Sequence, residues 1–94
     1  MSIELKSRVR LQKDVLIQKI GEEAVLLNLG TENYFALDEV GTSIVTILEE
    51  SDSVREAVGK LLQKYETEET KLTEDITHLV EECKEHGLLQ IIEA

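Results

Sequence analysis

Three short hydrophobic segments separated by turn residues occupy the first half of the chain. They span Val15–Ile20, Ala24–Leu29 and Tyr34–Leu37, and their lengths and β-favouring residues are typical of strands. Turn signals lie between them at Gly21-Glu22 and at residues 30–33, Gly-Thr-Glu-Asn. Because loops this short join antiparallel neighbours, the pattern predicts a three-stranded meander whose third strand lies at one edge.

In the second half, hydrophobic residues recur with the three- and four-residue spacing of helices. Asp38 is predicted to cap a first helix, and Ser53 to open a second with Glu56 as its capping-box partner. A third helix is expected from about Leu72 to His86, with Gly87 as a left-handed C-cap. The three hydrophobic stripes are Val40, Ile44, Ile47 and Leu48; then Val54, Ala57, Val58, Leu61, Leu62 and Tyr65; then Leu72, Ile76, Leu79, Val80 and Cys83.

The order of these elements predicts the fold class. Three short strands cannot bury both of their faces, so the helices must pack on one face of the meander. We therefore expect an α+β protein, a small winged-helix-like domain in which a three-stranded antiparallel meander is followed by three helices. The hydrophobic tail Leu88–Ile92 is expected to form a final strand or an extended segment on the core.

Charge divides the chain unevenly. The 94 residues carry a net charge of −10; residues 1–20 hold five basic and two acidic residues, a charge of +3, which leaves −13 for the rest. We expect residues 1–13 to be a basic N-terminal arm, flexible and solvated, and residues 14–94 to be the folded domain. The alternative is that the arm contacts an acidic partner.

Composition excludes several classes of protein. A single cysteine allows no internal disulfide and no multi-thiolate metal site. No hydrophobic run approaches the roughly 18 residues of a membrane span, and residues 1–14 lack the hydrophobic region of a signal peptide. We therefore expect a cytoplasmic protein that binds neither membrane nor nucleic acid, since the strong negative charge opposes contact with phosphates.

The residues that could carry chemistry have simpler explanations. His78, Cys83 and His86 do not share the spacing of metal ligands on a helix, so we expect no metal and no other cofactor. The carboxylates fall at helix starts and on polar faces, and no catalytic triad or phosphate-binding glycine pattern is present, so we expect no enzyme. DNA binding is also not expected, because the third helix has five acidic residues and one lysine.

The predicted edge strand is the strongest remaining candidate for a binding site. An uncovered edge offers unpaired N–H and C=O groups, and an extended peptide can add to it as a further strand. Strand alternation directs Phe35 and Leu37 toward the core and leaves the Tyr34 ring exposed beside the edge. The alternative interpretation is that Tyr34 only shields the hairpin.

The same residues resemble a known family. Residues 27–41 read Leu-Asn-Leu-Gly-Thr-Glu-Asn-Tyr-Phe-Ala-Leu-Asp-Glu-Val-Gly, which is similar to the PqqD pattern of a strand, a turn, Tyr-Phe-x-Leu-Asn/Asp-x-x-Gly and a helix. The later Lys64-Tyr65, Asp75-Ile76, Leu79 and Gly87-Leu88-Leu89 resemble the rest of that pattern. The likeness extends over residues 14–89 and departs at Val45, where many relatives carry Trp.

The resemblance implies a recognition element for ribosomally made, post-translationally modified peptides. Such proteins bind the leader segment of a precursor peptide as a strand antiparallel to the third strand, against the third helix. They present it to a modifying enzyme, such as a radical SAM enzyme in pyrroloquinoline quinone biosynthesis or a leader peptidase in lasso-peptide pathways. Carried over here, the peptide-binding residues are Asn33, Tyr34, Phe35, Ala36 and Leu37 on the strand and Asp75, Ile76, Leu79, Glu82 and Cys83 on the helix.

Two functions from different classes remain. The first is this peptide-binding adaptor, in which the acidic helix favours a leader with Lys or Arg. The second is a winged-helix structural or dimerisation module of a regulatory complex that does not bind DNA. A homodimer formed through the open edge would compete with a leader for the same strand.

Overall fold

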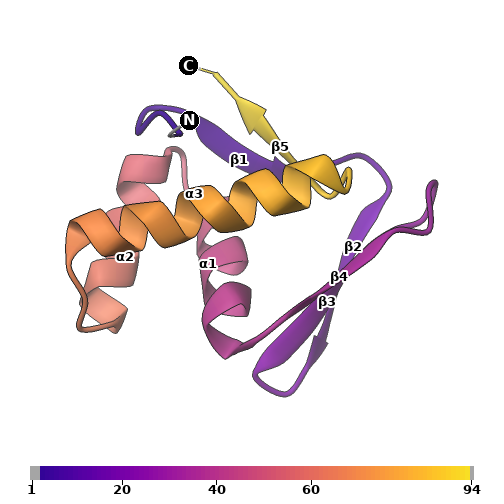
Figure 1. The fold of residues 1–94 in the computed structure, drawn as a ribbon, viewed down its shortest axis with the longest axis horizontal. Coiled ribbons are helices and arrows are strands. Elements are labelled where there is room, and N and C mark those ends of the chain that lie inside the picture. The colour runs from indigo at the N-terminus through magenta and orange to yellow at the C-terminus, as the bar shows by residue number, and fades with distance from the viewer. Residues whose placement is uncertain (1–2, 94) are drawn as a thin grey trace.

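The structure is a computed structural model that describes residues 3–93. These residues form five strands and three helices. Figure 1 shows the longest strands at one end of the molecule and the helices beside them. The elements are β1 (Arg8–Leu11), β2 (Val15–Ile20), β3 (Glu23–Asn28), β4 (Tyr34–Leu37), α1 (Glu39–Glu50), α2 (Val54–Lys64), α3 (Glu69–Glu85) and β5 (Leu89–Ile92).

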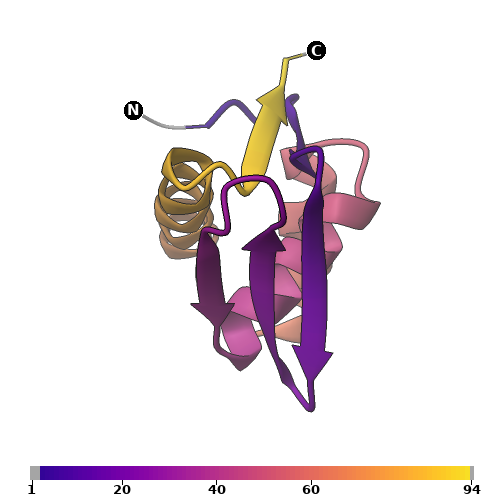
Figure 2. The same cartoon turned by 90° about the vertical axis from the view of Figure 1, so that its right-hand side faces the viewer.

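Strands β2, β3 and β4 form the predicted antiparallel sheet. Their order is β2-β3-β4, so β4 lies at one edge and β2 at the other (Figure 2). Ala24 pairs with Leu37 and Leu26 with Phe35, which places these four side chains on the face toward the helices. The predicted α+β class, with a three-stranded meander followed by three helices, is confirmed.

A second sheet, of two strands, joins the ends of the chain. β1 pairs with β5 in antiparallel register, from Arg8 opposite Ile92 to Leu11 opposite Leu89. The hydrophobic tail is therefore a strand, which is one of the two forms expected for it. Residues 8–11, which the sequence assigns to the flexible basic arm, form strand β1 instead, because Val9 is buried in the core.

Arg10 and two backbone carbonyls near the N-terminus form hydrogen bonds with the ends of α1 and α2. The Arg10 guanidinium donates to the carbonyl oxygens of Leu48 (3.2 Å) and Ser51 (2.9 Å) at the C-terminal end of α1. Just before β1, the carbonyls of Leu5 and Ser7 accept hydrogen bonds from the first two N–H groups of α2. The contacts of Leu5 and Ser7 satisfy N–H groups that have no partner within α2, and Arg10 adds a donor at the end of α1, where the Leu48 carbonyl also accepts the Ser51 N–H.

The helix ends follow the predicted caps. Asp38 accepts a hydrogen bond from the Gly41 N–H at 2.7 Å, and Ser53 accepts one from the first turn of α2. Gly87 has a φ of +72° after α3, and the next N–H bonds to the Cys83 carbonyl at 2.8 Å, as in a Schellman motif. The helix itself begins at Glu69, three residues before the predicted start at Leu72.

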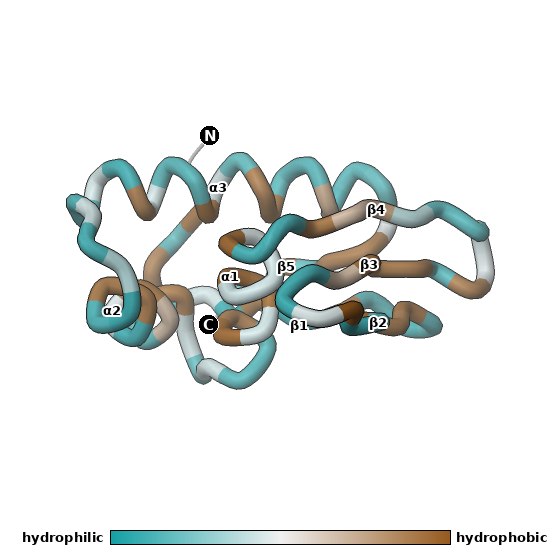
Figure 3. The backbone as a smooth tube through the Cα atoms, turned by 90° about the horizontal axis from the view of Figure 1, so that it is seen from below, coloured by the Kyte–Doolittle hydropathy of each residue, from teal (hydrophilic) through white to brown (hydrophobic). Residues whose placement is uncertain are grey.

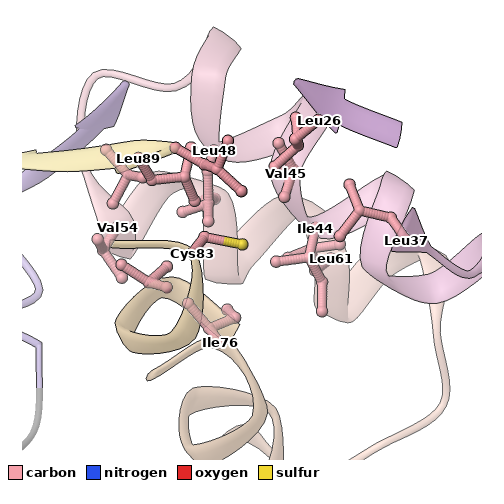
Figure 4. Packing of buried hydrophobic residues seen from close by; sticks show 14 of the residues in the cluster. Leu26, Leu37, Ile44, Val45, Leu48, Val54, Leu61, Ile76, Cys83 and Leu89 are labelled. Carbon is pink, nitrogen blue, oxygen red and sulfur yellow. The ribbon is translucent and has the colours of Figure 1, made fainter. Parts of the chain in front are cut away.

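The three helices and the inner sheet face enclose one hydrophobic core. Figure 4 shows side chains from both sheets and all three helices meeting there, with Cys83 among Leu48, Ile76 and Leu89. Burial raises the pKa of the Cys83 thiol to about 11, with a further contribution from the Glu82 charge. None of the helices described is both long and hydrophobic enough to traverse a bilayer.

Candidate functional site

The backbone of β3 alternates between its two neighbouring strands. The Asn28 N–H donates to the Asn33 carbonyl on the β4 side at 2.9 Å, whereas the Leu29 N–H donates to the Asp14 carbonyl on the β2 side at 2.9 Å. Because successive residues of a strand direct their N–H and C=O groups to opposite sides, the even-numbered residues of β3 bond to β4.

This alternation fixes which groups of β4 face away from the sheet. Tyr34 pairs with Leu27 and Ala36 with Val25, both odd-numbered residues of β3. Tyr34 and Ala36 are therefore at non-hydrogen-bonded positions of the ladder, and their two N–H and two C=O groups face the open edge. Within residues 3–93, no group from outside the sheet forms a hydrogen bond with any of these four. An extended chain could bond to all of them.

The side chains of β4 alternate as the sequence predicts. Leu37 is only 4% exposed and Phe35 is half-buried, so both belong to the inner face. Tyr34 is 70% exposed and Ala36 is also exposed. The edge strand therefore has an uncharged hydrophobic inner side and a solvated outer side.

A hollow lies where the inner side of β4 approaches α3. Figures 2 and 3 show that α3 runs beside β4, on the side away from β3. Here Leu79 of α3 meets the strand and the start of α1 around a hollow of about 310 Å³. Its lining residues are Phe35, Ala36, Leu37, Asp38, Gly41 and Leu79. Three of the five predicted strand residues and one predicted helix residue thus share one surface.

The other predicted residues of α3 fall into two groups. Ile76 and Cys83 have no exposed surface, so their side chains face the core rather than the hollow. Asp75 and Glu82 are exposed and lie four residues before and three residues after Leu79. That spacing places the two carboxylates on the same helix face as Leu79, one on either side of it.

Contacts that the sequence did not predict join the β3–β4 turn and β4 to the C-terminal end of α3. The Asn33 side chain donates to the His86 carbonyl at 3.2 Å, and the Phe35 and His86 rings lie 6.0 Å apart. The buried Asn28 side chain donates to the Gly87 carbonyl at 2.9 Å. In the sequence, Asn28 lies in the predicted strand Ala24–Leu29 and Asn33 in the turn at residues 30–33, and nothing local indicates that they reach the end of a helix more than 50 residues later.

The opposite edge of the sheet differs in its chemistry. The same alternation applies to β2, where the N–H groups of Ile17 and Lys19 point away from β3, toward the free edge of the sheet. Lys19 pairs with the buried Ala24, so its side chain leaves from the inner face of the sheet. An inward-pointing lysine on an edge strand discourages the addition of another strand. β4 has no charged residue, so only one of the two edges carries this protection.

Two solved structures are similar to this chain in sequence and fold. A structure described as "TbiB1 in Complex with the TbiA(beta) Leader Peptide" is 30% identical, with a TM-score of 0.79, over 86% of this chain and 94% of that one. Another, "Lasso peptide synthetase B1 complexed with the leader peptide", is 28% identical, with a TM-score of 0.78, over 88% of this chain and 98% of that one.

The family comparison covers most of the chain. No curated protein matches the sequence. The family described as "Coenzyme PQQ synthesis protein D (PqqD)" matches residues 23–89, which run from the start of β3 to the start of β5 and include β4, the hollow and all of α3. The chain therefore belongs to the PqqD family.

Proposed function

We propose that this protein binds the leader segment of a ribosomally made precursor peptide by β-strand addition to β4 and presents it to a modifying enzyme. The observation that carries the proposal is that the backbone N–H and C=O groups of Tyr34 and Ala36 face the open edge, beside the hollow that Leu79 lines. Main-chain hydrogen bonds supply affinity in strand addition, and side-chain pockets supply specificity. Both similar structures are described as complexes with leader peptides.

The bound leader would form a fourth strand antiparallel to β4. Neighbouring strands lie about 4.8 Å apart, so the leader would occupy the space between β4 and α3. Every second leader side chain would point to the same face as Phe35 and Leu37 and reach the hollow. A hydrophobic leader residue at that position would bury its side chain against Leu79.

The ten predicted binding residues have different roles in this proposal. Asn33–Leu37 provide the strand, and Leu79 provides the wall of the hollow. Ile76 and Cys83 would support that wall from within the core, since they have no exposed surface. Asp75 and Glu82 would attract a leader with Lys or Arg near its hydrophobic position.

The proposal assigns the chemical step to the partner. The partner would be a radical SAM enzyme or a leader peptidase of the cytoplasm, where the precursor is made. The adaptor itself would carry no catalytic residue and no cofactor. Its affinity for the leader would be moderate, because the peptide must be ordered on binding and then passed on.

A homodimer through the β4 edge would use the same backbone groups as the leader. Such a dimer would dissociate when leader is added, whereas a dimer through another surface would not. Analytical ultracentrifugation with and without leader distinguishes these cases. The alternative function, a structural or dimerisation module, is not favoured, because it leaves the hollow beside the open edge without an occupant.

The proposal is tested by titrating ¹⁵N-labelled protein with a synthetic leader peptide. The peptide takes the sequence of the N-terminal segment of the precursor encoded in the same gene cluster, and a scrambled peptide of equal composition is the control. We expect saturable amide shifts concentrated at residues 33–37 and on the hollow-facing side of α3. Shifts confined to other surfaces, or equal affinity for the scrambled peptide, would contradict it.

A further inference from the structure

Two asparagine side chains bond the C-terminal end of α3 to the β3–β4 turn. The Asn33 amide donates to the His86 carbonyl at 3.2 Å and the Asn28 amide to the Gly87 carbonyl at 2.9 Å. These carbonyls belong to the turn that ends α3, where the helix itself offers no partner. We call Asn28 and Asn33 the asparagine clamp.

The orientation of the Asn28 side chain is fixed by its surroundings. Its oxygen accepts hydrogen bonds from the N–H groups of Gly30 (2.8 Å) and Thr31 (3.0 Å). Its nitrogen must then be the atom that faces Gly87, because only a donor can satisfy a carbonyl oxygen. With 8% of its surface exposed, Asn28 is held on both sides, and one residue joins the turn rigidly to the helix end.

The clamp lies where it can determine the width of the space beside β4. α3 packs mainly against α2 and β5, and β4 is not among the elements that contact it most. The bond from Asn33, immediately before β4, and the Phe35–His86 ring contact hold the two walls together at one end. The other end, around Leu79 and Gly41, remains hollow.

We infer that Asn28 and Asn33 are positioning residues for leader binding, which hold α3 at the distance from β4 that a fourth strand requires. The inference rests on the proposed function; it adds Asn28 to the residues of the site and gives the Asn33 side chain a role beyond that of its backbone in the strand. A groove whose walls are already in place avoids the cost of ordering them when the peptide binds. The clamp would thus increase affinity, although neither side chain needs to contact the leader.

Isosteric substitutions separate this role from general stability. N28D keeps the oxygen that accepts from Gly30 and Thr31 but replaces the donor to Gly87 with an acceptor. N33D makes the same exchange at an exposed position, where loss of folding is not expected. T31A is the matched control, since its hydroxyl accepts from the Asn33 N–H within the turn and does not reach α3.

The measurement is the dissociation constant of a fluorescein-labelled synthetic leader of the precursor from the same gene cluster, taken well below the melting temperature of each variant. We expect about a tenfold weaker complex for N28D and about a threefold weaker one for N33D, in line with the loss of one hydrogen bond each. T31A should bind as the wild type does. If the clamp had only a structural role, N28D and N33D would lower the melting temperature and leave the affinity of the folded protein for the leader unchanged.

The outcomes distinguish this inference from the function on which it rests. If the wild type binds leader and folded N28D and N33D bind it equally well, the clamp has no positioning role and the inference is wrong. If the wild type does not bind leader, the proposed function fails and the inference fails with it. If N28D does not fold, N33D alone decides, because its exposed side chain leaves the core intact.

Discussion

Ala36 of β4 lies directly opposite Val25 of β3, at a position of the ladder where the paired residues exchange no hydrogen bonds. The Ala36 N–H and C=O groups therefore point away from the sheet, toward the hollow beside α3. An alanine keeps this part of the edge free of bulk, and its backbone can be approached closely by another chain.

Replacing Ala36 with proline should prevent leader binding without unfolding the protein. Proline removes an N–H donor that the sheet itself does not use, and proline is tolerated on edge strands. We expect at least a tenfold loss of affinity by fluorescence anisotropy and a nearly unchanged circular dichroism spectrum. K19P is the matched control, because it removes an outward-facing N–H from the opposite edge. Equal loss in both variants would count against a site on β4.

Leu79 should contribute to affinity through the hollow. L79A enlarges the hollow and removes hydrophobic surface that a leader side chain would cover, so we expect about a tenfold weaker complex. The free energy of unfolding should fall by about 1 kcal/mol, less than for a fully buried leucine. L62A removes a half-buried leucine of α2 far from β4 and should lower stability alone. Calorimetry of both variants with and without leader separates the two effects.

The carboxylates on either side of Leu79 should control the rate of association. The double substitution D75K/E82K reverses two exposed charges; the ion pair of Asp75 with Lys71, 3.5 Å long and exposed, adds little stability. We expect the association rate of a leader that carries Lys or Arg to fall about tenfold at low salt and much less at high salt. E74K/E81K changes the same net charge on another face of α3 and should have a weaker effect. Stopped-flow rates that are the same for the two variants would exclude a role for Asp75 and Glu82.

Burial of Cys83 should make stability depend on pH in the alkaline range. Its pKa is raised from 9.0 to about 11, so the unfolded chain loses the thiol proton more readily than the folded protein does. The stabilising contribution is complete below pH 9 and is lost as the pH rises toward 11. Urea unfolding of the wild type should show this decline, and C83A should show a shallower one from a lower starting stability. Parallel pH profiles would contradict the assignment.

Local patterns were sufficient to predict the elements around the site. The limits of β4 are those that the sequence predicts, and Asp38, Ser53 and Gly87 occupy the expected caps. These features depend on residues within four positions of one another, which a sequence displays directly. The exposure of Tyr34 and the burial of Leu37 follow from the same two-residue period.

The features that depend on distant partners could not be predicted in this way. β1 is recognisable as a strand only through its pairing with β5, about 80 residues later, and Arg10 reads as part of a basic arm until its bonds to the end of α1 are seen. Ile76 and Cys83 share the helix with Leu79, but only packing decides that they face the core. The start of α3 at Glu69 could not be predicted, because its first turn is polar and no capping side chain precedes it.

Amide hydrogen exchange at Tyr34 and Ala36 is the most direct test of strand addition to β4. Both N–H groups face the open edge in the free protein and should exchange rapidly. With saturating leader, we expect both to become protected by at least about tenfold, whereas the outward-facing amides of Ile17 and Lys19 on β2 keep their rates. A leader that binds and leaves Tyr34 and Ala36 as exchangeable as before would contradict the account.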